Sequence, residues 1–278
     1  PLSAPKSGDA MNEPMSEGKS NDQTSHRLMA ELDDLAASFD ENGYVIVKGL
    51  FDDTELFELE ASLVHFQEQV RTGALDRARY GGDYLTSADG QTPDFVNYVK
   101  DITRLSEPAS DAFHHPVLLA LMERCLGVEP WEMREEYGAR FGVVYQDARP
   151  GQESAYTRIG WHSDRQAYPN SDFYPSIALT FHIDATSPAN GFLRVVPGSH
   201  RSGTEGLPLN FEKVPGEVGA YCDAGDVMLH HCDLWHSAAR ATEDPPGGVR
   251  RHMRGGWFGG RIPDIGEELE AFNKNAAR

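Results

Sequence analysis

The sequence predicts a mainly β fold in which an antiparallel sandwich or barrel carries helices packed on one face. Two observations predict this class. Patterns typical of amphipathic helices fall before residue 127, whereas short strand-like runs separated by turn residues fill the second half. Single strands do not alternate with helices, as a parallel α/β sheet would require. No internal repeat is evident, so the pattern favours a globular domain over a repeat protein.

The first half contains three expected helices. Apolar residues recur at helical spacing over 28–39, and Asn42-Gly43 is a typical helix stop. The run 44–51 (YVIVKGLF) predicts a strand, after which Asp52-Asp53-Thr54 is expected to cap a second helix extending to about residue 70. A third helix is expected over 115–126 (HPVLLALMERCL).

The segment 71–112 between the second and third helices is polar and rich in glycine. It is therefore predicted to be loop with short elements. Its part 71–100 has the character of a lid over a pocket mouth, and an ordinary solvated loop is the equally weighted alternative.

The second half contains five short runs that predict strands, bounded by turn dipeptides such as Asn190-Gly191 and Pro197-Gly198. The runs cover 140–146, 177–184, 191–197, 225–231 and 253–258. So many short strands in succession are typical of an antiparallel sandwich or barrel.

Residues 1–25 are polar and lack periodicity, so we predict a disordered N-terminal tail followed by a single domain over 26–278. The tail has no apolar core of a secretory signal and does not begin with Met, so we expect a processed end. Three cysteines without a CxxC spacing indicate reduced thiols of a cytoplasmic protein. A monomer and a homodimer both remain open.

The net charge of −19 argues against partners that are themselves anionic, because like charges repel. We therefore expect no nucleic acid partner. No apolar stretch approaches the roughly 20 residues that span a bilayer, so no membrane association is expected either. The acidity of the chain does not say what the protein does bind.

The stretch GWHSD places His162 and Asp164 two residues apart, where side chains of an extended segment share a face. His236, just beyond the expected strand 225–231, is the best candidate for a third ligand. Two histidines and one carboxylate on one face of an octahedral ion leave three positions open, the pattern of non-haem Fe(II) oxygenases. For His182 and His200 we expect structural roles, and for His230 and His231 a place in the core or a role supporting a ligand. His252, like Arg254, is expected to line the pocket.

Open iron positions call for a chelating co-substrate such as 2-oxoglutarate, whose distal carboxylate needs a buried cation. Arginine suits this role because its guanidinium pairs bidentately with carboxylate. Strand alternation places Arg250 on one face with His252 and Arg254, and Arg251 on the other face with Met253 and Trp257. We favour Arg250 as the anchor, with Arg251 second.

Two polar residues of the strand before the GWHSD block, Tyr145 and Gln146, are further candidates for hydrogen bonds to 2-oxoglutarate. A register slip of one residue would turn either side chain away. Both residues therefore enter the candidate site as cofactor-binding residues, together with the two arginines.

Five blocks in order resemble the phytanoyl-CoA dioxygenase-like family of iron and 2-oxoglutarate-dependent oxygenases: FDENGYVIVKGLFDDTEL, GWHSD, NGFLRVVPGSHR, AGDVMLHHCDLWHSA and RRHMRGGW. The resemblance implies a double-stranded β-helix (jelly-roll) core and iron ligands at His162, Asp164 and His236. It also implies a salt bridge from 2-oxoglutarate to the arginine after the last histidine. Related halogenases replace the carboxylate that Asp164 retains, which argues against halogenation.

The resemblance further implies iron-dependent hydrogen abstraction from a small molecule, with O2 consumed and succinate and CO2 released. The expected substrate is a secondary metabolite. Hydroxylation, cyclisation, epimerisation and desaturation all begin with this step, and the blocks do not decide among them. Two alternatives use the same three residues: a zinc hydrolase, which needs no buried arginine, and a non-catalytic jelly-roll binding protein.

Overall fold

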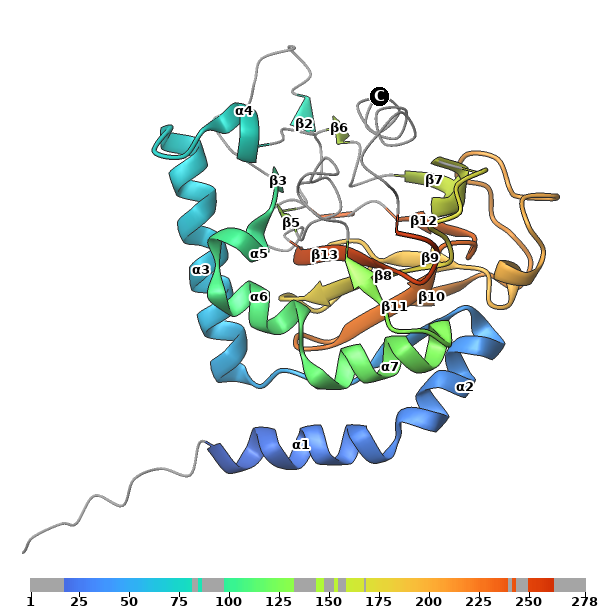
Figure 1. Ribbon diagram of the computed structural model, residues 1–278. Coiled ribbons are helices and arrows are strands. Elements are labelled where there is room, and N and C mark those ends of the chain that lie inside the picture. The colour runs from blue at the N-terminus through green and yellow to red at the C-terminus, as the bar shows by residue number, and fades with distance from the viewer. Residues whose placement is uncertain are drawn as a thin grey trace, which may run out of the picture.

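The larger of two facing antiparallel sheets forms the centre of the fold in the computed structural model (Figure 1). The structure describes residues 18–81, 85–86, 98–132, 144–147, 153–154, 159–167, 169–239, 242–243 and 250–262. The larger sheet has the order β1-β11-β8-β13-β5-β3, with β4 paired to β13. Its strands are β1 (Tyr44–Val47), β11 (Val227–His231), β8 (Ser176–His182), β13 (Arg251–Phe258), β5 (Val144–Asp147), β3 (Tyr98–Val99) and β4 (Trp131–Glu132).

The smaller sheet has the order β10-β9-β12-β7, and every pairing in it is antiparallel. Its strands are β10 (Val218–Ala220), β9 (Leu193–Val195), β12 (His236–Ala238) and β7 (Ile159–His162). A separate pair joins β2 (Leu85–Thr86) to β6 (Glu153–Ser154). Antiparallel sheets with helices on one of them confirm the predicted fold class.

The helices lie along the outer face of the larger sheet (Figure 1). They are α1 (Gly18–Ala30), α2 (Leu32–Asn42), α3 (Asp53–Thr72), α4 (Arg77–Tyr80), α5 (Ile102–Leu105), α6 (Glu107–Phe113) and α7 (Pro116–Leu126). The expected cap of α3 is present, because the Asp52 carboxylate accepts from the backbone N–H groups of Thr54 and Glu55. The Glu55 side chain in turn accepts from the Asp52 N–H, which completes a capping box.

The main hydrophobic core lies between these helices and the sheet. Alternate residues of each strand point outward into it, as the period of two requires. They include Val45, Val47, Ile177, Leu179, Phe181, Val227, Leu229, Met253 and Trp257, which pack with Leu59, Leu63, Phe113, Leu118 and Leu121 of the helices. The Phe113 and Trp257 rings stack with centroids 5.3 Å apart, so α6 is fixed directly on β13.

The space between the two sheets has two different halves. One half is a small apolar core that includes Val195, Met228 and Leu234. The other half is a cavity lined by polar side chains. The two sheets therefore pack directly against each other at one end and enclose a cavity with many polar lining residues at the other.

Two boundaries differ from the sequence prediction. The expected helix over 28–42 is two helices with a turn at Glu31, which lets both α1 and α2 pack against α7. The helix α1 begins at Gly18, inside the segment 1–25 predicted to be disordered, and residues 1–17 lie outside the described residues. Leu28, the first apolar residue of the expected pattern, is buried and anchors α1. The turns of α1 before Leu28 therefore gave no periodic signal in the sequence.

The segment 71–112 contains more structure than predicted. The helices α5 and α6 occupy its end, and α6 buries Ala109, Ala112 and Phe113 against the core. Its short length hides helical periodicity in the sequence. Much of the expected lid segment, 82–84 and 87–97, lies outside the described residues.

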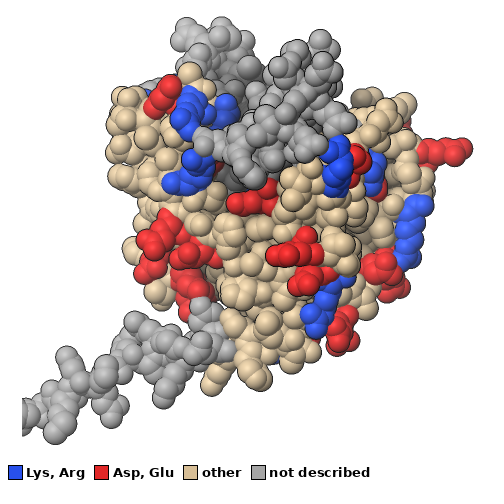
Figure 2. Space-filling view, in the orientation of Figure 1, with Lys and Arg blue, Asp and Glu red and all other residues tan. Residues whose placement is uncertain are grey.

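Acidic side chains gather beside α3 on the face shown in Figure 2. A groove between α3 and α6 is lined by four of them, Glu55, Glu58, Glu107 and Asp111. A face of this kind repels polyanions. Within the described ranges, no helix has both the length and the hydropathy to cross a bilayer.

Candidate metal centre and cavity

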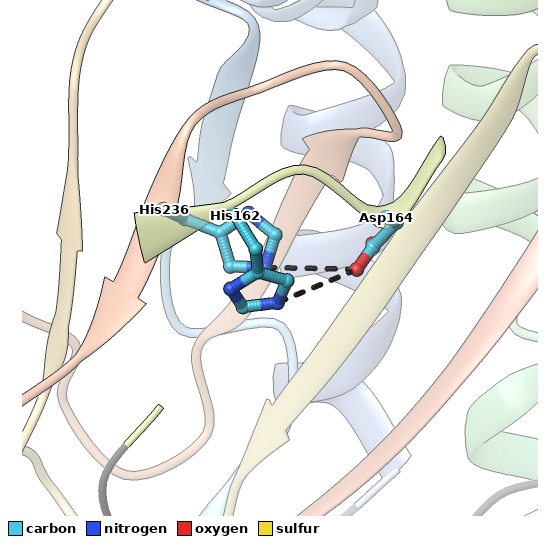
Figure 3. A group of neighbouring side chains, drawn as sticks. All are labelled: His162, Asp164 and His236. Carbon is cyan, nitrogen blue, oxygen red and sulfur yellow. Dashed lines mark ion pairs between the residues drawn. The ribbon is translucent and has the colours of Figure 1, made fainter. Parts of the chain in front are cut away.

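Three side chains from two neighbouring strands meet at the edge of the smaller sheet. His162 ends β7, Asp164 follows it at the start of a 3-10 turn (Asp164–Ala167), and His236 begins β12. His162 and His236 are direct partners in the β7–β12 register. One Asp164 oxygen, Oδ1, lies 3.9 Å from His162 Nε2 and 3.6 Å from His236 Nε2 (Figure 3).

Backbone carbonyls fix the orientation of both imidazoles. The Nδ1 atom of His162 lies 2.9 Å from the Gly160 carbonyl oxygen, and that of His236 lies 2.9 Å from the Leu234 carbonyl oxygen. Since a carbonyl only accepts, each Nδ1 carries the proton and each Nε2 offers a lone pair. Burial and the neighbouring His162 hold the pKa of His236 well below its ordinary value, so this ligand is neutral.

The Asp164 carboxylate is oriented by His230 of β11. His230 Nε2 lies 3.2 Å from Asp164 Oδ2, which leaves Oδ1 facing the two histidine ligands. Burial by itself would raise the pKa of Asp164, but attraction to His236 and the hydrogen bond from His230 outweigh it and lower that pKa. The carboxylate is therefore ionised, and the supporting role expected for His230 is confirmed.

This donor set fits ferrous iron. Its ligand atoms lie within 4.8 Å of one another, close enough to share one ion. Two imidazoles and one carboxylate on one side of an ion leave positions open for a chelating co-substrate and O2. The residues present thus fit a catalytic iron centre.

A second cluster, His231, Cys232 and Asp233, also has its potential donor atoms close together. Each of these atoms is already engaged. Asp233 pairs with Arg165, and His231 Nδ1 accepts from the Asp233 N–H at 3.1 Å. The Cys232 sulfur accepts from the Ser176 N–H at 3.4 Å, and burial raises the pKa of the thiol to about 12. This cluster holds the turn together and is a poor metal site.

The two histidines of the candidate metal centre, His162 and His236, line the cavity between the sheets. Its described lining comes from both sheets: Ile159, His162, Ala178, Leu179, Thr180, His182, Leu193, His230, His236, Ala238, Arg250, His252 and Arg254. The smaller sheet contributes an apolar wall around its two ligands. The larger sheet contributes hydroxyl, imidazole and guanidinium groups. The lining role expected for His252 and Arg254 is therefore confirmed.

Arg250 lies in this cavity and is 5% exposed. Its Nε atom has no hydrogen-bond partner among the described residues. Burial lowers its pKa to about 10, so the guanidinium remains charged at neutral pH. A buried cation without a carboxylate partner is costly, and an anionic ligand would compensate it.

Arg251, the second candidate anchor, points to the opposite face of β13. Its guanidinium pairs with Asp184 through Nε at 2.8 Å and Nη2 at 2.7 Å, and with Glu60 of α3. The hydrogen bonds that Arg251 donates to Asp184 raise the pKa of Arg251. Arg251 thus fastens β13 to its neighbours and does not line the described cavity, because strand alternation turns it away.

Tyr145 and Gln146 lie on β5, opposite Met253 and His252 of β13. Their backbone is next to the cavity strand, as expected. Their side chains lie outside the described residues, so the expectation that they contact 2-oxoglutarate stays a prediction.

Sequence reasoning assigned His182 and His200 to structural roles. This is right for His200, whose Nε2 lies 3.1 Å from the Asp40 carbonyl oxygen near the end of α2. It is wrong for His182, which lines the cavity with both ring nitrogens unpartnered among the described residues. The missed signal was alternation along β8, which places Ala178, Thr180 and His182 on one face.

Two facing sheets with a His-Asp-His set at a strand end define a jelly-roll protein of the non-haem iron class. The chain matches the family Phytanoyl-CoA dioxygenase (PhyH) over residues 39–245 and belongs to it. Family membership and the metal centre together make the protein an iron- and 2-oxoglutarate-dependent dioxygenase, as the resemblance implied.

Individual relatives are distant. The chain is 24% identical over 224 residues to the iron/alpha-ketoglutarate-dependent dioxygenase ausU of Aspergillus calidoustus, which covers 78% of this chain and 67% of the relative. It is 25% identical over 246 residues to 1-deoxypentalenic acid 11-beta-hydroxylase of Streptomyces arenae, covering 81% of each. Among solved structures, SnoN, a non-heme alpha ketoglutarate dependent epimerase from nogalamycin biosynthesis, shares the fold with a TM-score of 0.58 and 23% identity, covering 82% of this chain and 83% of SnoN.

Proposed function

We propose that this enzyme oxidises a C–H bond of a small molecule of specialised metabolism, by hydroxylation or by a related cyclisation, epimerisation or desaturation. Fe(II) is held by His162, Asp164 and His236, and 2-oxoglutarate is held by Arg250. The observation that carries the proposal is that one cavity is lined both by two of the three candidate ligands, His162 and His236, and by a buried arginine whose Nε has no partner among the described residues.

The chain's own residues prepare the metal centre. Hydrogen bonds from Nδ1 to backbone carbonyls hold the rings of His162 and His236 aimed at the ion. His230 holds one oxygen of Asp164 and so presents the other to the ion. Iron bound here with 2-oxoglutarate and O2 supplies the oxidising chemistry, with succinate and CO2 as co-products.

The larger sheet provides the anchor for the co-substrate. Arg250 supplies a permanent positive charge, and its fork matches the two oxygens of a carboxylate. His182 adds two unpartnered ring nitrogens next to it in the lining. A bound dicarboxylate would accept from the Arg250 guanidinium and from the one N–H of the neutral His182 ring, and a buried donor left without a partner costs about 1–3 kcal/mol.

The smaller sheet is the side that suits the substrate. Ile159, Leu193 and Ala238 present an apolar wall near the two histidine ligands. Such a wall can receive a carbon skeleton and exclude water from the reacting bond. The named activities of the relatives, an 11-beta-hydroxylase and an epimerase of nogalamycin biosynthesis, support specialised metabolism as the setting.

A cytoplasmic setting belongs to the same proposal. All three cysteines, Cys125, Cys222 and Cys232, are free thiols. Free thiols are typical of a reducing compartment.

Anaerobic addition of Fe(II) and then 2-oxoglutarate to the purified protein tests the proposal. A weak charge-transfer band toward the red end of the visible spectrum is expected, and it should be absent from the Asp164→Ala variant. A zinc hydrolase or a non-catalytic binding protein would give no such band. Full turnover by Asp164→Ala, measured as succinate release with a true substrate, would show the ligand assignment to be wrong.

A further inference from the structure

Arg165, the residue after Asp164, is held by the turn between β11 and β12. Its backbone N–H donates to the Cys232 carbonyl oxygen at 3.0 Å. Its guanidinium forks onto Asp233, with Nε 2.5 Å from Oδ1 and Nη2 2.9 Å from Oδ2. The fork is partly buried, with side-chain exposures of 31% for Arg165 and 18% for Asp233.

Tyr174 completes the surroundings of Arg165 from a third direction. The guanidinium carbon lies 4.6 Å from the centre of the Tyr174 ring. The Tyr174 hydroxyl donates to the Asp164 carbonyl oxygen at 3.2 Å. Main chain and side chains therefore hold Asp164 and Arg165 as one unit.

The turn that holds Arg165 also connects two residues on the other side of the candidate metal centre. It begins after β11, which supplies His230, and it ends at His236, the first residue of β12. The Asp233 N–H donates to His231 Nδ1, which stiffens the turn itself. Asp164 and His236 are far apart in sequence, and the Arg165–Asp233 fork joins their two segments directly.

We propose that Arg165 and Asp233 are a positioning pair that sets the affinity of the metal centre by fixing Asp164 relative to His236. The pair touches neither the ion nor the substrate. This inference rests on the iron site proposed above. A bidentate pair is suited to the role because it restrains orientation as well as distance.

Anaerobic equilibrium dialysis against Fe(II), with metal analysis of the protein, tests the proposal. Arg165→Gln and Asp233→Asn are each expected to weaken Fe(II) binding by about 10- to 100-fold, as outer partners of metal ligands do. The double variant should bind no more weakly than the weaker single variant, because both changes remove one interaction. Arg165→Lys keeps the charge but loses the fork, so its affinity should fall between.

A matched control exists in the same half of the chain. Arg261 donates its backbone N–H to the Asp172 carbonyl oxygen at 2.8 Å, and its guanidinium forks onto the Asp172 carboxylate at 2.5 and 3.2 Å. No metal ligand adjoins this pair in the sequence. Arg261→Gln should leave the Fe(II) dissociation constant unchanged. The thermal midpoint of each metal-free variant separates loss of affinity from loss of folding.

The outcomes distinguish the two proposals. Wild-type affinity in Arg165→Gln and Asp233→Asn, with no binding by Asp164→Ala, would overturn the positioning pair and leave the iron site standing. Wild-type affinity in Asp164→Ala would overturn the iron site itself. If Arg165→Gln does not fold, Arg165→Lys decides, since unchanged affinity in that variant contradicts the proposal.

Discussion

Two neighbouring arginines at the start of β13, Arg250 and Arg251, have opposite surroundings. Arg251 faces outward and is paired with Asp184 and Glu60. Arg250 faces the cavity, is nearly inaccessible, and has an unpartnered Nε among the described residues. Arg251 thus holds neighbouring elements together on the outer face, whereas the positive charge of Arg250 can bind an anionic ligand in the cavity.

The difference extends to the whole larger sheet. Most of its outward residues are apolar and pack on helices, so they contribute mainly to stability. Its inward residues near the metal centre include His182, Arg250 and His252, whose burial is costly without a ligand. Substitutions on the outward face should therefore change folding without changing ligand binding, and substitutions on the inward face should do the reverse.

Trp257→Ala tests the outward face and should have the largest effect. It removes a ring stacked on Phe113 in the main core. The expected loss is about 3–5 kcal/mol of unfolding free energy, measured by urea denaturation. Affinity for 2-oxoglutarate in the remaining folded protein should not change, and a parallel loss of affinity would break the division between the faces.

Arg250→Gln tests the inward face. Because it removes the buried charge that pairs with the distal carboxylate, the dissociation constant for 2-oxoglutarate should rise about 100-fold. An anaerobic titration of the charge-transfer band at fixed Fe(II) measures it. The adjacent control, Arg251→Gln, should keep wild-type affinity and lower the thermal midpoint instead. Equal losses of affinity in both variants would contradict the assignment of Arg250.

His182→Leu should have a smaller effect on the same titration. It removes two ring nitrogens from the cavity without removing charge, so affinity for 2-oxoglutarate should fall about 10-fold, the value of one ordinary hydrogen bond. The folded protein should be no less stable, since an unpartnered polar group is replaced by an apolar one. His200→Leu removes an imidazole outside the cavity and should leave affinity unchanged.

The pH dependence of stability gives the smallest expected effect. Burial, followed by repulsion from Arg250 and Lys48, lowers the pKa of His182 to about 3. The unfolded chain therefore takes up a proton near pH 6.5 and the folded chain does not, so stability falls as the pH falls below 6.5. His182→Leu should remove about 0.8 kcal/mol of the loss between pH 7.5 and 6.0. Identical urea midpoint shifts in both proteins would contradict this.

Much of the fold followed from periodicity in the sequence. The strands β1, β8, β11 and β13 and the helices α3 and α7 lie where alternation, helical spacing and caps predicted them. These elements are long or strongly amphipathic, because each has one face on the main core. The two faces of β13 were also predicted correctly from alternation.

The parts that were missed are short or depend on distant contacts. The strands β7 and β12 carry the metal ligands but have only four and three residues, too few for a periodic signal. The ligands themselves were found by motif. The Arg165–Asp233 fork joins residues 68 positions apart. No local pattern encodes such pairs.

The direct pairing of His162 with His236 across β7 and β12 has a consequence for how the protein matures. The two residues become neighbours only after the chain between them has formed β8, β9 and β11 and the smaller sheet has closed. Contacts of such large sequence separation form late, because loop closure must precede them. We therefore expect iron to bind at this site only in a folded chain, so that metal content would report the fraction of correctly assembled molecules.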